Sequence, residues 1–237
     1  MARNSHTFQK CITFINAIVN LKYINPTERD SMSRHLKLLL GTVAAFAVFA
    51  TPLASVHAEE ESLKSIPLTE LLNLKTSDFD SNLSDFDIFT ALFMDVWGLL
   101  PESKIQVISD GNEVLTAFIP NDRAFRRLVT FLTGKTLTSE SNIATAVMNL
   151  GEKTVENILL YHIISGQNLT YTQVLSSDEV VLSAISGSSI RINVSGSSLL
   201  LIDKKSKHTN PVIVTSKSDL NLGSKQIAHG INQVLLP

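Results

Sequence analysis

Residues 116–125 read TAFIPNDRAF, an apolar run that changes within a few residues into the start of a helix. Pro120 fixes the backbone where the change occurs, and Asn121 is a residue type that accepts a hydrogen bond from the first amides of a helix. Phe118 and Phe125 stand on either side of this point as apolar anchors. The stretch therefore predicts a buried strand, a tight corner and a helix with one buried face.

Two later stretches continue the pattern. Residues 159–166 read LLYHIISG, in which Tyr161 and His162 close a predicted helix and Gly166 lets the chain turn into the following strands. Residues 227–237 read IAHGINQVLLP and predict a strand that pairs back and ends the domain.

In this order, the three stretches resemble the three motifs of the fasciclin (FAS1) family, and the resemblance covers residues 84–237. It implies a single, non-catalytic adhesion domain outside the cell. It also implies a role in adhesion, in some animal members, for the motif that holds Tyr161 and His162. The closing motif here contains His229 and Asn232. Asn232 stands where the family usually has Asp, which keeps hydrogen bonding but removes a charge.

Hydrophobic periodicity predicts an α+β domain, with helices mainly in the first half and a β-rich second half that forms a twisted sheet. Asp110-Gly111 is a hairpin signal between two short apolar runs. The expected helices are a turn or two at 68–74, then 86–100 with Ser84 or Asp85 as N-cap, the helix that Asn121 begins and Gly134 ends, 138–150 and 154–163. The expected strands are 105–108, 114–119, 180–185, 190–194, 199–202, 212–215 and 233–236.

The N-terminal part reads as an export signal. Residues 32–58 contain a short basic region, an apolar run and a Val-His-Ala cleavage pattern, which are the three parts of a secretory signal peptide. An uncleaved membrane anchor is the alternative, since the uncharged run is just long enough to span a bilayer. We expect translation to start at Met32, residues 1–31 to be a spurious extension, and residues 59–83 to be a linker.

Composition limits the possible partners. The chain has a net charge of −2, but residues 1–58 carry +4 and residues 59–237 carry −6. An acidic body argues against nucleic acid, and mutual repulsion fits a monomer in solution. The single cysteine, Cys11, rules out an internal disulfide and a thiolate metal cluster. We therefore expect a secreted or cell-surface protein whose partner is a cell-envelope or extracellular-matrix protein or polysaccharide.

Motifs for chemistry are absent from the sequence. It has no serine-hydrolase elbow, no phosphate-binding loop, and no local pair of histidines with metal-ligand spacing. Asp78, Asp80, Asn82 and Ser84 alternate as in a calcium loop, but Leu83 replaces its glycine and Phe89 its glutamate, so a solvated acidic loop is expected. No enzyme, cofactor or metal is predicted; a polysaccharide- or small-ligand-binding module and a secreted hydrolase are the alternatives.

Two points stay open in the sequence. Tyr161 and His162 are either an adhesive site or structural residues, and their apolar neighbours favour the structural interpretation. Asn82, Asn168 and Asn193 lie in glycosylation sequons, which matter only in a eukaryotic secretory pathway. The short signal peptide and the body without cysteine are typical of a bacterial protein, in which these sequons would be chance matches.

Overall fold

The computed structural model describes residues 62–72, 79–196, 198–205 and 209–237. Helices predominate in the first half of this part of the chain and short strands in the second half. The predicted signal peptide, the N-terminal extension and Asp78 lie outside these residues. The helical elements are α3 (Leu68–Leu71), α4 (Asp87–Leu99), η1 (Lys104–Ser109), α5 (Asp122–Thr133), α6 (Glu140–Met148), α7 (Glu152–Tyr161), α8 (Tyr171–Leu175) and η2 (Thr215–Lys217). The strands are β1 (Leu115–Pro120), β2 (Ile163–Ser165), β3 (Val181–Ser183), β4 (Ser189–Ser195), β5 (Ser198–Ile202) and β6 (Gln226–Ile231). The α+β prediction is confirmed.

Strand β1 is the centre of the domain. It pairs with β2 in antiparallel register and with β6 in parallel register, which places Phe118 opposite His229. All six residues of β1 and all six of β6 are buried. A strand pair buried along its whole length must be covered on both faces.

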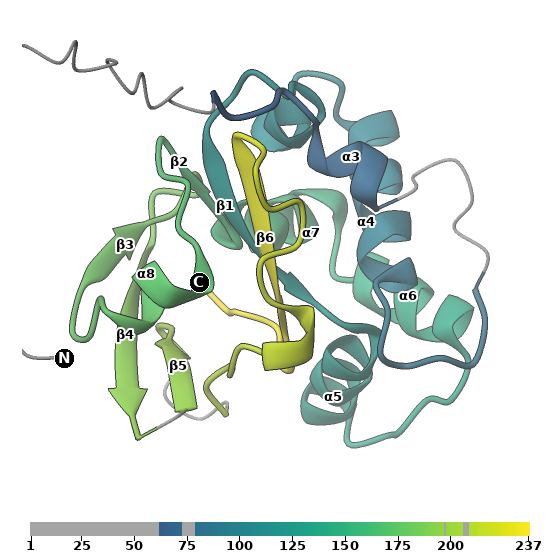
Figure 1. Cartoon of the computed structure of the whole chain (residues 1–237). Helices are drawn as coiled ribbons and strands as arrows, with labels where there is room; N and C mark the ends of the chain where they lie inside the picture. The colour runs from purple at the N-terminus through teal and green to yellow at the C-terminus, as the bar shows by residue number, and fades with distance from the viewer. Residues whose placement is uncertain (1–61, 73–78, 197, 206–208) are drawn as a thin grey trace, which may run out of the picture. The chain divides into compact units, whose positions relative to one another are not determined.

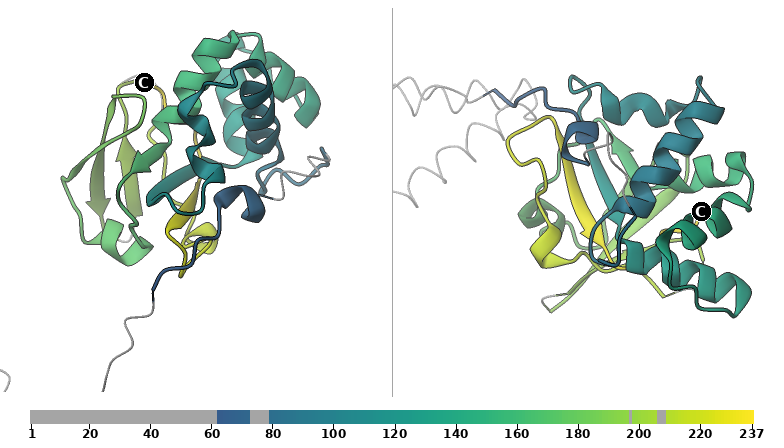
Figure 2. Two further views of the ribbon diagram at one scale, coloured as in Figure 1. Left: turned by 90° about the horizontal axis from the view of Figure 1, so that it is seen from above. Right: turned by 90° about the vertical axis from the view of Figure 1, so that its right-hand side faces the viewer.

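The two faces of this sheet pack against different layers. Ala117 and Ile119 belong to the hydrophobic cluster formed with α4, α5, α6 and α7, whereas Phe118 belongs to the cluster formed with the second sheet, β3-β4-β5. This division follows the pleat, because neighbouring residues of a strand point to opposite faces. Figure 1 shows α4, α5, α6 and α7 on one side of β1 and β6 and the second sheet, with α8, on the other, and the left-hand view in Figure 2 shows the same separation.

The corner between β1 and α5 sits at the end of this central strand. Asn121 Oδ1 accepts a hydrogen bond of 3.0 Å from the amide of Ala124, so Asn121 is the N-cap of α5. Phe118 and Phe125 are 0% and 1% exposed. Gly134 ends the helix with a φ of 71°, in the left-handed region that glycine adopts at little cost.

The predicted hairpin at Asp110-Gly111 is wrong. Residues 104–109 form the 3-10 helix η1, in which Ile105 and Ile108 are buried on one side. Glycine is required for a different reason here, because a Cβ at Gly111 would lie 2.2 Å from the carbonyl oxygen of Ser65. The dipeptide marks a close backbone approach rather than a turn between strands.

Two predicted strands are also wrong. Residues 212–215 make only isolated bridges, Leu200 with Val212 and Ile213 with Ile231. The closing strand is β6, which ends at Ile231, and residues 233–236 follow it without regular structure. The apolar side chains of Val234 and Leu235 fill the core instead of forming a strand.

The N-cap prediction for α4 is wrong as well. Phe86 is the N-cap residue and gives no side-chain bond. Neither Ser84 nor Asp85 caps the helix; the amide of Ile88 instead donates to Asp122 Oδ1, at 2.8 Å, from the start of α5. The cap is therefore supplied by a residue distant in the sequence.

Candidate functional site: a basic groove along α5

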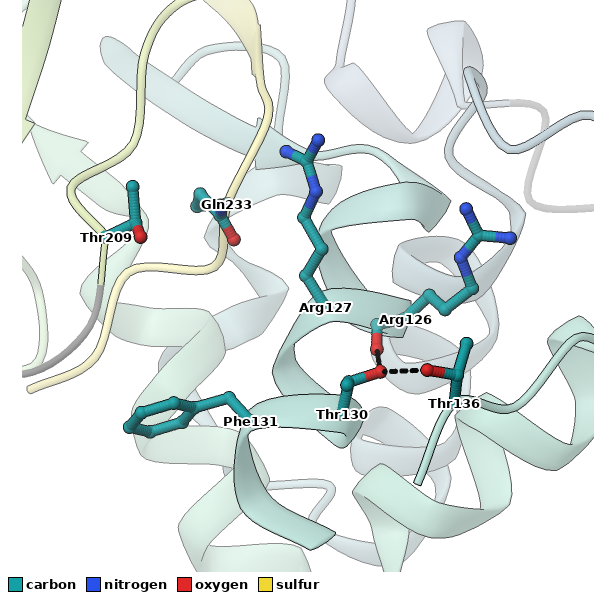
Figure 3. A pocket seen from close by; sticks show the side chains of 7 residues that line it. All are labelled: Arg126, Arg127, Thr130, Phe131, Thr136, Thr209 and Gln233. Atoms are coloured by element: carbon teal, nitrogen blue, oxygen red, sulfur yellow. Dashed lines mark hydrogen bonds between the residues drawn. The ribbon is translucent and has the colours of Figure 1, made fainter. Parts of the chain in front are cut away.

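The exposed side of α5 carries a groove with a volume of about 560 Å³. Its walls come from α5, from the loop that follows it, and from two segments near the C-terminus (Figure 3). The residues that line it are Arg126, Arg127, Thr130, Phe131, Thr136, Thr209 and Gln233.

The periodicity of α5 explains why these side chains share a face. Ala124, Phe125, Leu128 and Val129 are buried against the core. Arg126, Arg127, Thr130 and Phe131 occupy the positions between and beyond them, and residues three or four apart on a helix, such as Arg126 with Thr130 and Arg127 with Phe131, lie next to each other on its surface.

Hydrogen bonds hold the walls of the groove together. Thr130 Oγ1 donates to the carbonyl oxygen of Arg126 at 2.9 Å and lies 3.3 Å from Thr136 Oγ1. Arg127 Nη1 donates to the carbonyl oxygen of Asn232 at 2.9 Å, which ties α5 to the segment that follows β6. Gln233, next to Asn232, has a buried Oε1 atom without a hydrogen-bond partner among the described residues.

Positive charge in the groove is not neutralised by an ion pair in the part of the chain that the structure describes. The two ion pairs seen there, Lys153 with Glu156 and Arg191 with Glu179, lie on other elements. The groove therefore presents guanidinium groups, hydroxyls, an amide and the half-exposed ring of Phe131. Such a set can bind an anionic, hydroxyl-rich ligand, since guanidinium groups pair well with carboxylates.

Tyr161 and His162 are not on the surface, because both are 0% exposed. The Tyr161 hydroxyl donates to the carbonyl oxygen of Ser189 at 2.7 Å. Burial, with a smaller contribution from the charge of Asp203, raises the pKa of Tyr161 to about 12. The tyrosine therefore links the end of α7 to β4 as a neutral group.

His162 is the C-cap of α7 and uses both ring nitrogens. Its Nε2 accepts from the amide of Leu235 at 2.9 Å, so Nδ1 carries the proton and donates to the carbonyl oxygen of Ile158 at 2.7 Å. Burial lowers the pKa of His162 to about 4. The neutral imidazole ring of His162 thus links the C-terminal segment to α7.

Hydrogen bonds of the side chains also hold the closing motif inside the domain. His229 Nδ1 accepts from the amide of Asp219 at 3.2 Å, and its Nε2 donates to the carbonyl oxygen of Leu169 at 2.8 Å. Its ring stacks on Phe118 with centroids 5.9 Å apart. Asn232 Oδ1 accepts from the amide of Val212 at 2.9 Å, a bond that needs no charge.

Comparison with known sequences assigns the family. The sequence model of the fasciclin domain matches residues 85–237. The chain belongs to the fasciclin family. Domains of this family typically act in cell adhesion, lie outside the cell or at its surface, and are generally non-catalytic.

A solved structure with a similar fold is a FAS1 domain pair from the insect cell adhesion molecule fasciclin I. It has 14% sequence identity and a TM-score of 0.46; the match covers 67% of this chain and 48% of the insect chain, so this chain spans about half of its length. No curated protein matches. In the described ranges of this fasciclin domain, no helix is both long and apolar enough to cross a membrane.

The groove lies mostly outside the fasciclin motifs, and of its lining residues only Gln233 belongs to one of them, the closing stretch 227–237. Gly166 has a φ of 75° and turns the chain after β2, while Pro120 ends β1 and Phe125 lies on the buried face of α5, on either side of the corner. The structure brings Tyr161, His162 and the motif residue His229 into the interior, and none of them lines the groove. Sequence reasoning missed the groove, although three arginines on one short helix of an acidic domain were a usable signal.

One sequon has a structural use. The side-chain amide of Asn168 donates to the carbonyl oxygens of Ser224 and Lys225 at 2.8 and 2.9 Å. A glycan on this nitrogen would have to replace these bonds in the folded domain. Asn82 and Asn193 also donate from their side-chain amides, to Asp85 and Glu179.

Proposed function

We propose that this protein is an exported, non-catalytic adhesion module that binds an acidic polysaccharide of a cell envelope or extracellular matrix through the groove along α5. The observation that carries the proposal is the pairing of Arg126 and Arg127 with hydroxyl, amide and aromatic side chains on one exposed face. Membership of the fasciclin family supports the adhesive role.

The chemistry of the groove favours a sugar polymer over a protein. Arginine binds carboxylates in a bidentate manner, as uronic acids would present them. The side chains of Thr130, Thr209 and Gln233 suit sugar hydroxyls, and Phe131 offers an apolar ring against which a sugar can pack.

Tyr161 and His162 have a structural role in this proposal. Their polar atoms are already bound inside the domain, so a partner could reach them only after local opening. Catalysis by this pair is equally disfavoured, because His162 is neutral and both of its ring nitrogens are engaged.

Binding of the full chain to immobilised polysaccharides tests the proposal. We expect retention on polygalacturonate that falls as salt rises, and none on a neutral glucan of similar length, because the charge of the ligand supplies the contact. Binding to poly-glutamate but not to polygalacturonate would contradict the assignment of a sugar ligand. Equal binding to neutral and acidic polymers would contradict the role of the arginines.

Three arginine variants of α5 give the matched comparison. Arg126→Ala and Arg127→Ala should each weaken binding about tenfold or more, as expected when a charge-assisted contact is lost. Arg123→Ala removes the same charge from the same helix but outside the groove, and should change binding little. Equal losses in all three variants would indicate attraction by net charge alone and sink the groove as the site.

A further inference from the structure

Three carboxylates meet at the starts of three helices, on a part of the domain that the groove does not use. Asp85 lies just before α4, Asp122 is the first residue of α5, and Glu140 is the first residue of α6. One oxygen atom from each of them lies within 4.8 Å of the others. Asp85 also belongs to a second such group with Asp80 and Asp87.

Each of the three carboxylates uses one oxygen inside the protein. Asp122 Oδ1 accepts from the amide of Ile88 at 2.8 Å, and Glu140 Oε2 accepts from the amide of Asp80 at 2.7 Å. Asp85 Oδ2 accepts at 2.7 Å from the side-chain amide of a neighbouring asparagine. These bonds fix the orientation of the carboxylates, as outer hydrogen bonds do around metal ions.

The second oxygen of each carboxylate has no N–H or hydroxyl donor among the described residues, and the Asp85 and Asp122 carboxyls lie close enough to share a proton. These atoms, Asp85 Oδ1, Asp122 Oδ2 and Glu140 Oε1, are all buried. The side chains of Asp122 and Glu140 belong to residues that are 0% and 1% exposed. Burying a carboxylate oxygen without a partner costs several kcal/mol, so these three oxygens need either shared protons or a bound ligand.

The local electrostatics point the same way. Burial raises the pKa values of both Asp122 and Glu140. A hydrogen bond to the Asp85 carboxyl raises the pKa of Asp122 further, and the nearby charges that raise both pKa values are other carboxylates. In the part of the chain that the structure describes, no basic side chain contributes to either shift. A positive charge bound at this point would relieve both the desolvation and the mutual repulsion.

We propose that Asp85, Asp122 and Glu140 bind one hard divalent cation, with Ca²⁺ as the preferred ion. The group contains only oxygen ligands and no His or Cys, which favours calcium over zinc. Oxygen atoms bound to one Ca²⁺ at about 2.4 Å lie at most about 4.8 Å apart, so one oxygen from each of these residues can reach the same ion. Water and the neighbouring carboxylates complete the six to eight ligands that this ion takes.

The site differs from the calcium loop that the alternating residues of 78–84 resemble. Asp80, Asn82 and Ser84 are exposed, as expected of a solvated loop. The proposed ligands come instead from three separate helix starts, so no local spacing identifies them. A bound ion would join the starts of α4, α5 and α6 into one rigid corner (Figure 1).

Calcium titration of the full chain, freed of metal with EDTA and kept at constant pH and ionic strength, tests the site. We expect one Ca²⁺ per chain by calorimetry, with a dissociation constant on the order of 10⁻⁴–10⁻³ M, as in other extracellular modules. Ca²⁺ at about ten times that constant should raise the melting temperature by about 3–6 °C. Mg²⁺ should do less, because it requires a stricter octahedral geometry.

Conservative variants distinguish the binding of a cation from the sharing of a proton between the carboxylates. Asp122→Asn and Glu140→Gln keep the oxygen that accepts from the backbone, so both should fold; both should lose at least about tenfold in Ca²⁺ affinity. In EDTA they should melt at or above the wild-type temperature, and in Ca²⁺ below it. Glu152→Gln removes the same charge from the first turn of α7, where the side chain is exposed, and should leave the Ca²⁺ shift unchanged.

Three results would each contradict part or all of the proposal. If Ca²⁺ changes neither the heat signal nor the melting temperature of the wild-type chain, the carboxylates share protons only. If Asp122→Asn retains the full Ca²⁺ shift, any binding observed is elsewhere on the acidic surface. A shift with Mg²⁺ alone would overturn the choice of calcium.

Discussion

Buried polar side chains differ in how completely they are hydrogen-bonded at the two ends of the helical layer. Where α7 ends, His162 has a hydrogen bond on each ring nitrogen and the Tyr161 hydroxyl has its acceptor. Where α5 and α6 begin, Asp122 and Glu140 each have one oxygen that accepts a backbone amide and one without an N–H or hydroxyl donor among the described residues. Among these residues, the first arrangement is complete and the second is not.

This difference separates a structural site from a ligand site better than burial or residue type does. Buried polar groups are almost always hydrogen-bonded, so a fully bonded group needs no further explanation. A structural role in the fold therefore accounts for the hydrogen bonds of the buried histidines. It does not account for the carboxylates, so the inference of a cation rests on the carboxylates and not on the family motif.

The largest effect on stability is expected from Phe118→Ala, next to the fully hydrogen-bonded histidines. Phe118 is fully buried and stacks on His229, so its loss should lower the free energy of unfolding by about 3–5 kcal/mol. Phe131→Ala makes the same change on a side chain that is 44% exposed and should cost under about 1 kcal/mol. Denaturant melts that place the two variants within experimental error of each other would contradict the packing of β1.

The corner at residues 116–125 could be predicted because all of its signals are local. A buried strand, a proline, a capping asparagine and a helical apolar stripe lie within ten residues, and each alone restricts the backbone. The short strands at 181–183, 189–195 and 198–202 follow from the same kind of evidence, since β-rich runs alternate there with glycine turns.

The rest depends on contacts that no local pattern contains. Gly111 looks like a hairpin residue, and only the neighbouring backbone of Ser65 explains the glycine. The cap of α4 comes from Asp122, and the groove needs Gln233 to meet α5. The proposed cation ligands share this property, because each belongs to a different helix start.

The pH dependence of stability tests the protonation state of the buried histidines more finely. Burial lowers the pKa of His162 to about 4 in the folded state, against about 6.5 in the unfolded chain, so the unfolded chain binds the proton more tightly. Stability from the neutral ring is present above about pH 6.5 and lost as pH falls towards about 4, by at most about 3 kcal/mol. His229, whose pKa burial also lowers, contributes in the same direction.

His162→Gln removes one of these two contributions. Its free energy of unfolding should therefore fall less between about pH 7 and pH 4 than that of the wild type, although it is lower at pH 7. Urea melts at several pH values measure the difference. Parallel pH profiles for wild type and variant would show that His162 is not held neutral by the fold.

The smallest effect concerns the helix caps at the other end, and it tests whether the carboxylates are there only for capping. Asn121→Ala removes the side-chain bond to the amide of Ala124 and should cost about 1 kcal/mol. Ser139→Ala is the matched control, because the Ser139 side chain makes no cap bond to α6, and it should cost close to nothing. Capping alone accounts for one oxygen of Asp122 but leaves its second oxygen unexplained. If a cation accounts for that second oxygen, the cost of Asn121→Ala should be the same in EDTA and in Ca²⁺, since Asn121 is not a ligand. A cost that appears only when Ca²⁺ is present would show instead that the cap and the carboxylates act as one unit, and the separation drawn between them would be wrong.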